Sequence, residues 1–555
     1  MGADAVTTQH HRGGAIGGGE VGSCLTRIHH DRFTDAHAVA DPVRERRAAI
    51  GFAHEVSVIA ALDAANPGAV VHIGDQADAP TRTLEALRDR ATIIVGGRIA
   101  SLDGSLVGAP DVLVRFPSGY APVEIKSHLV TRRNGIRTVA TPLDAMGTAV
   151  RVHHHDEAGN EPDEDAPDPI RFRSNRVRDL YQVAHYWRIL DDFGEACNRP
   201  LGGVIGTEDP LACAWVDLTD SRGNGHDTIL DEAVAWTEQA VDALRRGDDH
   251  PEHPAIAPWW RSECSQCPWR LVCRSVLEEI GDPTMLSGVD ADVRKALALD
   301  GVATVDDIAA LDLADGRFVN ATAVPQARAM VAGTLLRRAG VDPPLDVPQP
   351  ARAVDFDIET FDNRIYLAGF LVSEDGQSTY DWIADWEWTD RSERSFVERL
   401  FAKLAAFSDR GTRVFHWTEY ERTQLAAASA RYGMSIPGFA MINDWFNEHA
   451  TDLHRWTKNH FISPDGYSLK TVAPLCGFTW RDDDAGGQQS ELWFEAMLGG
   501  DPSMQRRLLE YNEDDVAAQL AIRRWVVDND DGSGSGSAIP SVNEVPVRRR
   551  RRPVP

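Results

Sequence analysis

Alternating hydrophobic and polar positions predict two pairs of β-strands that lie far apart in the chain. Residues 108–126, GAPDVLVRFPSGYAPVEIK, contain two apolar-rich runs around a Pro/Ser/Gly turn and predict a β-hairpin. Residues 353–372, AVDFDIETFDNRIYLAGFLV, predict a second strand pair. Apolar residues at helical spacing predict helices at 44–62, 178–193 and 508–526. This mixture of strands and helices is typical of an α/β multidomain protein.

Changes in composition divide the chain further, as expected because 555 residues are too many for one hydrophobic core. A Pro-rich stretch separates two α/β regions, and an acidic, Pro-rich insert at 153–169 predicts a flexible loop. We predict a disordered N-terminus at 1–22, an α/β region at 23–282, a helical segment at 283–340, an extended linker at 341–350, a second α/β region at 351–528 and a disordered basic tail at 529–555.

The net charge narrows the classes of partner. The chain has 57 basic and 85 acidic residues, a formal charge of −28, which argues against a protein that coats nucleic acid nonspecifically. A nuclease is still compatible with this charge, because an active site needs positive groups and metal ions only locally. We find no apolar run that predicts a membrane span, and the N-terminus lacks the apolar core of a signal peptide, so we expect a cytoplasmic protein.

The predicted hairpin carries residue types that suit phosphodiester chemistry. Glu124 and Lys126 are two apart on one strand and project from the same face, and Asp111 on the paired strand can join them. Two carboxylates beside an ammonium can hold a divalent cation and an attacking water, with Lys126 stabilising negative charge. The alternative is a surface hairpin with an ordinary cross-strand ion pair.

Two predicted helices offer further candidates. His54 and Glu55 follow Gly51, and either can add a metal ligand from a helix. Gln182 and Tyr186 are four apart on the second helix and share a face suited to contacting a nucleic-acid strand. The alternative for each pair is a structural role in helix packing.

The cysteine spacing predicts a metal centre. Cys264, Cys267 and Cys273 form a compact C-x2-C-x5-C set, and Cys24 lies at the opposite end of the same α/β region. In a cytosolic chain such spacing indicates metal rather than disulfides, and by itself it suits either zinc or a four-iron cluster.

Taken together, residues 24–275 resemble the RecB-like branch of the PD-(D/E)XK nucleases that carry an iron–sulfur centre. The resemblance implies a restriction-endonuclease-like fold, Asp111 and Glu124 as ligands of Mg²⁺ or Mn²⁺, and Lys126 as the catalytic lysine. It implies that the four cysteines, Cys24, Cys264, Cys267 and Cys273, hold a [4Fe–4S] cluster. The family places its first-motif His four residues after a Gly. Here Glu55 has that spacing and His54 lies one residue earlier.

The segment at 285–311 resembles a helix–hairpin–helix motif, with LSGVD at 286–290 as the hairpin. Such hairpins contact phosphates through backbone amides at a helix N-terminus. Asp290 stands where the motif usually has Gly. The alternative is a helical spacer.

The second α/β region carries another set of acidic residues. Asp357 and Glu359 are two apart on one predicted strand, and Tyr511 and Asp515 are four apart on one predicted helix. Glu421 begins a further helix. Carboxylates from separate elements suit a two-metal phosphodiesterase, in which Tyr511 positions the attacking water.

Residues 351–528 resemble the ribonuclease H-like DEDD exonucleases. Asp357-x-Glu359 matches the first motif, HWTEYERTQL the second, with Glu421 where Asp is usual, and Tyr511-x3-Asp515 the third. Asp514 beside Asp515 leaves the register open by one residue. The resemblance implies a 3′–5′ exonuclease that uses Mg²⁺ or Mn²⁺.

The order of the parts resembles a bacterial group of RecB-family nucleases. We therefore expect a nuclease with two sites that acts on DNA ends or single strands, in repair, recombination or defence. One alternative is an RNA-processing exonuclease that uses only the C-terminal site. Another is a nucleic-acid-binding scaffold in which both sites have decayed.

Overall fold

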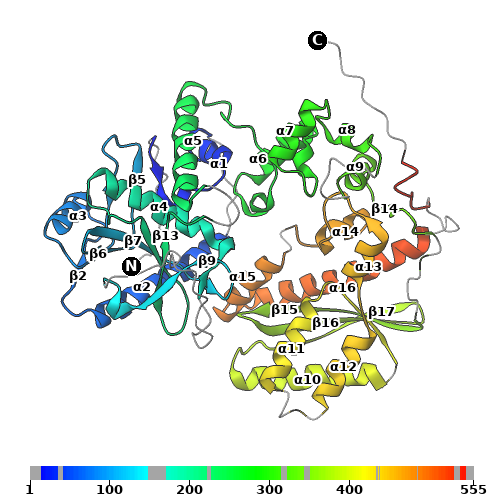
Figure 1. Ribbon diagram of the computed structural model, residues 1–555. Helices are drawn as coiled ribbons and strands as arrows, with labels where there is room; N and C mark the ends of the chain where they lie inside the picture. The colour runs from blue at the N-terminus through cyan, green and yellow to red at the C-terminus, as the bar shows by residue number, and fades with distance from the viewer. Residues whose placement is uncertain are drawn as a thin grey trace, which may run out of the picture. The chain divides into compact units, whose positions relative to one another are not determined.

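The computed structural model describes residues 14–34, 42–147, 170–221, 227–313, 322–342, 345, 350–409, 411–432, 436, 438–483, 486–529 and 538–545. The chain forms two compact units (Figure 1). The first comprises Met1–Pro258 with Gln266–Arg270, and the second comprises Trp259–Ser265 with Leu271–Pro555. The predicted loop at 153–169 lies outside the described residues.

The first unit is built on a seven-stranded mixed sheet of order β10-β13-β12-β7-β6-β3-β2. Its strands are β2 (Val70–His72), β3 (Ile93–Val95), β6 (Val112–Phe116), β7 (Gly119–Ile125), β10 (Val139–Pro142), β12 (Leu201–Ile205) and β13 (Ala212–Asp217). β6 and β7 pair antiparallel, with Val112 opposite Val123, so the predicted hairpin is confirmed. All of β7 is buried, which places the hairpin in the middle of the sheet.

Among the residues that the structure describes, five α-helices and two small sheets complete the first unit. The helices are α1 (Leu25–Phe33), α2 (Pro42–Ala65), α3 (Ala79–Arg88), α4 (Val177–Asp192) and α5 (Ile229–Asp249). The small sheets are β1 (Ile16–Gly17), β5 (Leu106–Gly108) and β4 (Ile99–Ala100), and β8 (Thr131–Arg132), β11 (Arg171–Phe172) and β9 (Ile136–Arg137). α4 packs on β7 and β12, so it lies next to the hairpin.

Residues 14–22, part of the stretch predicted to be disordered at 1–22, are ordered, whereas residues 1–13 lie outside the described residues. Ile16 is fully buried and pairs with Leu106, and a short 3₁₀ helix, η1 (Gly18–Glu20), follows it. The glycines that suggested disorder permit close packing instead, because a Cβ on Gly18 would lie 2.3 Å from the Tyr186 ring.

α2 also corrects one statement from the sequence. Within the part of the chain that the structure describes, Arg44–Ala65 is the single helical stretch long and apolar enough to cross a membrane. This is weak evidence for a span, because helices of water-soluble proteins pass the same test. In the structure Val58 and Leu62 of α2 are fully buried in the core of the first unit.

The second unit contains a five-stranded sheet of order β17-β16-β15-β18-β19. Its strands are β15 (Arg352–Phe361), β16 (Arg364–Glu374), β17 (Gln377–Ala384), β18 (Arg413–His416) and β19 (Ala450–Asp452). The first three form an antiparallel meander, and β18 and β19 run parallel to β15. The predicted strand pair at 353–372 is therefore confirmed as β15 and β16.

Helices cover both faces of this sheet (Figure 1). α10 (Asp390–Asp409), α11 (Tyr420–Tyr432) and α12 (Phe439–His449) lie on one face. α16 (Ser503–Asn529) crosses the other, accompanied by α13 (Leu453–His460), α14 (Leu469–Leu475) and α15 (Gly487–Leu498). The predicted helix at 508–526 thus lies within the long α16, directly against β15 and β16.

The middle segment forms a small helical core of α7 (Ala291–Leu299), α8 (Val305–Ala309) and α9 (Ala323–Ala332), after α6 (Arg270–Ile280). It is not wholly helical, because β14 (Leu336–Arg337) pairs with β20 (Phe461–Ile462). Asp290 caps α7 by accepting bonds from the amides of Asp292 and Val293. Those amides are therefore already used, which disfavours the predicted phosphate contact through this hairpin.

Part of the predicted disordered tail is ordered. Ile539 and Val542 are buried, and the backbone of Arg337 exchanges hydrogen bonds with Pro540 and Val542. Residues 538–545 therefore pair with the edge of β14. Burial of the apolar side chains of Ile539 and Val542 favours this arrangement.

Candidate active sites

Three carboxylates of the second unit come together, and we call Asp357, Glu359 and Asp515 the triad site. Their ligand atoms all lie within 4.8 Å of one another, which holds for no other group of three or more His, Cys, Asp or Glu among the described residues. Asp357 and Glu359 share one face of β15 because strand side chains alternate, and α16 brings Asp515 across that face. Glu359 and Asp515 are each 6% exposed.

Each carboxylate of the triad site is held through one oxygen by a protein donor. Asn512 Nδ2 donates to Asp357 Oδ2 at 2.8 Å, and Ser490 Oγ donates to Glu359 Oε2 at 2.7 Å. Asp515 Oδ1 accepts from Lys470 Nζ at 2.8 Å and from Trp480 Nε1 at 2.6 Å. These donors orient the carboxylates and leave each with a second oxygen that they do not occupy.

Asn512 is itself fixed by its neighbours. The Tyr380 hydroxyl donates to Asn512 Oδ1 at 2.9 Å. Gly369 lies opposite Asp357 on β16, and a Cβ there would fall 1.6 Å from Asn512 Oδ1. Only glycine therefore leaves room for the amide that holds Asp357.

Crowding of like charges shifts the titration of the triad site. Burial and the neighbouring Glu359 and Asp515 raise the pKa of Asp357 well above its ordinary value. Burial and Asp515 raise the pKa of Glu359 to about 8. A divalent cation would relieve this repulsion, and buried carboxylate oxygens are hard ligands suited to Mg²⁺ or Mn²⁺.

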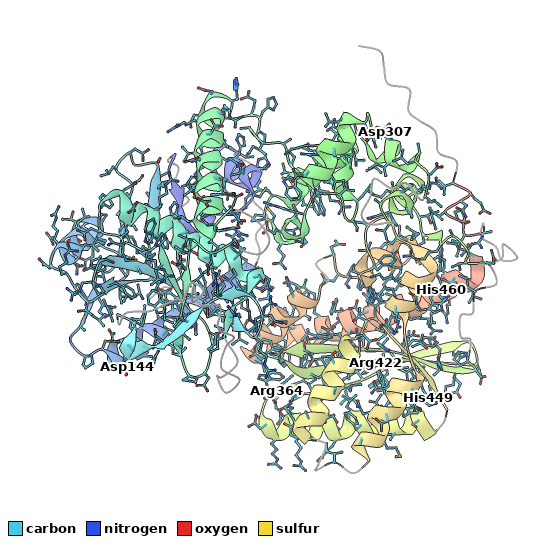
Figure 2. The ribbon with its side chains drawn as sticks, viewed as in Figure 1. Asp144, Asp307, Arg364, Arg422, His449 and His460 are labelled. Carbon is cyan, nitrogen blue, oxygen red and sulfur yellow. The ribbon has the colours of Figure 1, made fainter. Side chains whose placement is uncertain are left out.

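Glu421, predicted as a catalytic carboxylate of this set, does not belong to the group within 4.8 Å, but its charge contributes to the raised pKa of Asp357. It is 3% exposed at the start of α11, with its Oε2 3.3 Å from His416 Nδ1. The same nitrogen lies 2.6 Å from the Thr418 carbonyl oxygen. The next residue, Arg422, is labelled on α11 in Figure 2. It anchors this helix by donating to the Ala450 carbonyl oxygen at 3.0 Å.

The structure also distinguishes Asp515 from Asp514. Asp514 accepts from the backbone amide and the guanidinium of Arg481, each at 2.8 Å, so it serves the packing of α16. Tyr511 is 4% exposed, and burial together with Asp515 raises its pKa well above the ordinary value. Tyr511 therefore keeps its proton and can act as a hydrogen-bonding group.

The hairpin brings together Asp111, Glu124 and Lys126, which we call the hairpin site. Lys126 Nζ donates to Glu124 Oε2 at 2.9 Å, and Asp111 Oδ2 accepts from the Ile125 amide at 2.7 Å. Burial and the neighbouring Glu124 raise the pKa of Asp111 well above its ordinary value. Burial also raises the pKa of Glu124, whose Oε1 is buried without a hydrogen-bond partner.

Gln182 and Tyr186 support the hairpin site. Gln182 Oε1 accepts from Lys126 Nζ at 2.8 Å, and Gln182 Nε2 donates to the Tyr186 hydroxyl at 2.9 Å. Tyr186 is 2% exposed beneath Gly18. The helix face that carries the pair packs against η1 and the sheet, and the contact of Gln182 and Tyr186 with nucleic acid stays a prediction.

The structure separates the two candidates on α2. His54 Nε2 lies 3.2 Å from the Gly206 carbonyl oxygen. Glu55 instead interacts with the hairpin site, because burial and the charge of Glu124 raise its pKa. The charge of Glu124 thus acts on Glu55, and which of the two residues binds a metal stays a prediction.

The four cysteines are not gathered as predicted. Cys24 and Cys267 belong to the first unit and Cys264 and Cys273 to the second, and none is disulfide-bonded. No close group of ligand atoms contains them within the described ranges. Cys24 does influence the titration of Cys267, but the described residues give no evidence for the predicted [4Fe–4S] cluster or for zinc, so we derive no function from either.

Four residues of the triad site were missed from the sequence: Lys470, Trp480, Ser490 and Asn512. Asn512 could have been found from the sequence, because it lies next to Tyr511 on the predicted helix. Lys470 stands in the stretch SLKTVAPL, whose position along the chain does not reveal its spatial neighbours. Their roles depend on helices, and for Trp480 on the connection between α14 and α15, that come close to β15 only in the folded unit.

Comparison with known proteins supports the second unit alone. Residues 354–527 match the family model described as the RNase_H superfamily, which covers the five-stranded sheet and α16 and thus includes the triad site. Neither the curated proteins nor the solved structures yielded a match to the chain. The chain therefore contains an RNase H-like α/β domain, and this domain indicates hydrolysis of nucleic acid by a Mg²⁺- or Mn²⁺-dependent nuclease.

Proposed function

We propose that this protein is an exonuclease that hydrolyses DNA at the triad site with Mg²⁺ or Mn²⁺. The observation that carries the proposal is the convergence of three buried or half-buried carboxylates within 4.8 Å, inside a domain of the RNase H superfamily. Asp357, Glu359 and Asp515 would hold the cation through the oxygens that their protein donors do not occupy. The bound cation supplies an activated water and stabilisation of charge on the phosphate.

The chain's own residues supply orientation and charge. Asn512 and Ser490 restrict the carboxylates of Asp357 and Glu359 to one rotation each. Tyr511, protonated and edge-on to Trp493 at 5.8 Å, would align the attacking water through its hydroxyl. Lys470 stands beside Asp515, where its ammonium can stabilise negative charge on a phosphate.

A second activity at the hairpin site is favoured by one specific observation. The carboxylate oxygen Glu124 Oε1 is buried without a partner, although leaving a buried acceptor unpaired costs free energy. A divalent cation held by Glu124, Asp111 and Glu55 would satisfy it, with Lys126 beside the reacting phosphate. This arrangement supports the PD-(D/E)XK interpretation of the first unit.

The substrate proposal is DNA, attacked from a strand end, in repair, recombination or defence. Support comes from the likeness of both sites to nucleases of that kind. RNA processing by the triad site alone is the competing proposal.

The test follows degradation of end-labelled single- and double-stranded DNA and RNA with Mn²⁺. It compares wild type with Asp357→Ala and Lys126→Ala. We expect Asp357→Ala to abolish one product pattern and Lys126→Ala to abolish another. Binding of all four substrates without cleavage would overturn the proposal in favour of a scaffold. Cleavage of RNA alone, lost in Asp357→Ala, would favour the competing proposal.

A further inference from the structure

Seven arginines of the first unit lie in two short stretches of an otherwise acidic chain. Residues 127–137 contain three of them and residues 170–178 contain four, and neither stretch has an acidic residue. We call this set the arginine track, and its members are Arg132, Arg133, Arg137, Arg171, Arg173, Arg176 and Arg178. The formal charge of the whole chain is −28, so the local charge of these stretches is opposite in sign to that of the chain.

The small sheet β8-β11-β9 brings three members of the track into one row. Arg171 on β11 is in register with Arg132 on one side and with Arg137 on the other. Residues in register on neighbouring strands project from the same face of a sheet. The next residue of β11, Phe172, projects from the opposite face, where it is buried together with its partner Ile136. The sheet therefore packs its apolar face inward and carries three arginines in a row on the other face.

Such a row costs stability unless an anion lies against it, because like charges directly opposite on neighbouring strands repel each other. Arg137 Nη2 pairs with Asp220 Oδ1 at 3.1 Å. The partners of Arg132 are uncharged, since its guanidinium donates to the Asn134 carbonyl oxygen and to the Ser174 hydroxyl. Protein carboxylates thus offset only part of the repulsion, and phosphate groups bound to the row would offset the rest.

A short 3₁₀ helix connects the row to the start of α4. This helix, η3 (Ser174–Arg176), begins with the residue whose hydroxyl accepts from Arg132 Nη2 at 2.9 Å. It ends with Arg176, an exposed member of the track, and α4 follows with the exposed Arg178 in its first turn. The positive charge therefore continues from the small sheet to α4.

A cavity of about 270 Å³ lies where the track reaches the hairpin site. Arg176 and Arg178 line it, together with the acid Asp179, which lies 3.0 Å from His128 Nε2. Gln182 belongs to the same lining, and its Oε1 accepts from the lysine of the hairpin site at 2.8 Å. The cavity and the hairpin site thus share one residue. A cavity below about 300 Å³ is smaller than most pockets for drug-sized ligands, so it suits one nucleotide of a single strand better than a duplex.

We propose that the arginine track binds the phosphates of a single nucleic-acid strand and leads this strand to the hairpin site. The continuity between the track and the hairpin site identifies the occupant, and the inference therefore rests on the proposed activity of that site. Arginine binds phosphate oxygens through paired N–H donors. Phosphate contacts position a strand without reading its sequence, so single strands of DNA and of RNA both bind.

The test measures binding of labelled oligothymidylate and oligouridylate to the full-length protein by fluorescence anisotropy, in EDTA so that neither strand is cleaved. It compares wild type with a track variant that combines Arg132→Gln, Arg171→Gln and Arg176→Gln, because glutamine keeps a donor and removes the charge. We expect the track variant to lose about 10- to 100-fold in affinity for both strands. The slope of log affinity against log salt should become shallower by about 2, since each lost phosphate contact on a single strand contributes about 0.7.

A control variant makes the same change in charge outside the track. It combines Arg88→Gln, Arg90→Gln and Arg246→Gln, three exposed arginines at the end of α3 and on α5. Its affinity for both strands should stay within about threefold of wild type, because salt screens charges that do not contact the strand. The unfolding temperature of the track variant should not fall, since neutralising facing arginines removes a repulsion.

The outcomes separate this inference from the proposed activity. Equal losses of affinity in the track and control variants would overturn the inference. Unchanged affinity in the track variant would also overturn it and leave the acidic stretch at 153–169 as the partner of the arginines. A larger loss for a duplex of equal length than for the single strands would overturn the choice of a single strand. If the track variant loses strand binding while wild type shows no cleavage that depends on Lys126, the inference stands and the proposed activity of the hairpin site fails.

Discussion

The two acidic sites of this protein each contain a lysine, but they use it differently. In the hairpin site Lys126 is bonded to Glu124 and Gln182, and its side chain is 21% exposed. In the triad site Lys470 is bonded to Asp515, lies against two aromatic rings and is 32% exposed. Lys126 thus pairs with one buried carboxylate, that of Glu124. Lys470 pairs with Asp515, and its charge also acts on Asp357 and Glu359.

The origins of the carboxylates differ as well. Asp111 directly precedes β6 and Glu124 lies on β7, so one hairpin is enough to bring them together. Asp357 and Asp515 are brought together by the packing of α16 on β15. A site assembled over a longer sequence distance needs more supporting residues, and the triad site has them in Asn512, Ser490 and Trp480.

The largest expected effect distinguishes Asp515, a member of the triad site, from its neighbour Asp514. Asp515→Asn should lower cleavage at this site by about 10²- to 10³-fold, because a charged ligand is lost. The matched control is Asp514→Asn, which changes a residue bonded to Arg481 and should stay within about threefold. Rates on end-labelled DNA measure both. Equal losses of cleavage in the two variants would mean that Asp515 is not the catalytic carboxylate of α16.

The next effect tests the lysine of the hairpin site. Lys126→Met should lower the free energy of unfolding of the first unit by about 3 kcal/mol, because Glu124 loses its partner in the core. Breaking a buried ion pair costs about 3–5 kcal/mol. We expect the lower value, because Glu124 can take up a proton and lose its charge. Urea denaturation measures it, with Lys126→Arg as the charge-retaining control. A loss below about 1 kcal/mol would show that Glu124 does not depend on Lys126.

A smaller effect tests the support around the triad site. Asn512→Ala should weaken Mn²⁺ binding by about 10- to 100-fold, because Asp357 loses the donor that orients it. Tyr380→Phe removes only the hydroxyl bonded to Asn512 and should weaken binding less. Titration with Mn²⁺ gives both affinities. The reverse order would place the orienting role on Tyr380.

The smallest expected effect is a pH dependence of stability caused by His185 on α4. Burial lowers the pKa of His185 on α4 from 6.5 to about 4, and its Nε2 donates to the Val107 carbonyl oxygen at 3.0 Å. Because the unfolded chain binds this proton more tightly, stability should fall as the pH drops from about 6.5 towards 4. At pH 5.5 the loss from this residue is about 1.3 kcal/mol.

Unfolding curves of wild type and His185→Gln at pH 7.5 and 5.5 isolate this contribution. The glutamine amide can still donate to Val107 but does not titrate in this range. The variant should therefore lose less stability than wild type on acidification. The same pH sensitivity in both proteins would assign the effect to other groups.

The local pattern of hydrophobic and polar residues predicted several helices and strands correctly. The hairpin, the strand pair β15–β16 and the helices α2, α4 and α16 lie where periodicity predicted them. The proximity of Asp357 to Glu359 also followed, because residues two apart on a strand share a face. The structure adds that Asp355, with the same spacing, is a buried partner of Arg523 at 2.5 Å and not a member of the site.

Local pattern did not indicate the surroundings of several residues, because burial or packing decided them. Glu421 has the charge and the approximate position of a ligand, yet its longer side chain reaches His416. Tyr186 has the predicted helix face, yet that face is covered by η1, which composition had suggested was disordered. Ile539 and Val542 were assigned to a tail because their neighbours are polar, although both are buried.

The sequence by itself determined the α/β character, the hairpin with Glu124 and Lys126, and the acidic pair on β15, because strand and helix periods are local properties of the chain. The tertiary structure alone decided which distant groups meet these residues. It selected Asp515 over Asp514, assigned Glu421 to His416, and placed Lys470 among three carboxylates. The physical reason is that burial and charge pairing depend on which elements pack together, as α16 does on β15 where Asn512 meets Asp357 across 155 residues of chain, and no local pattern encodes that packing.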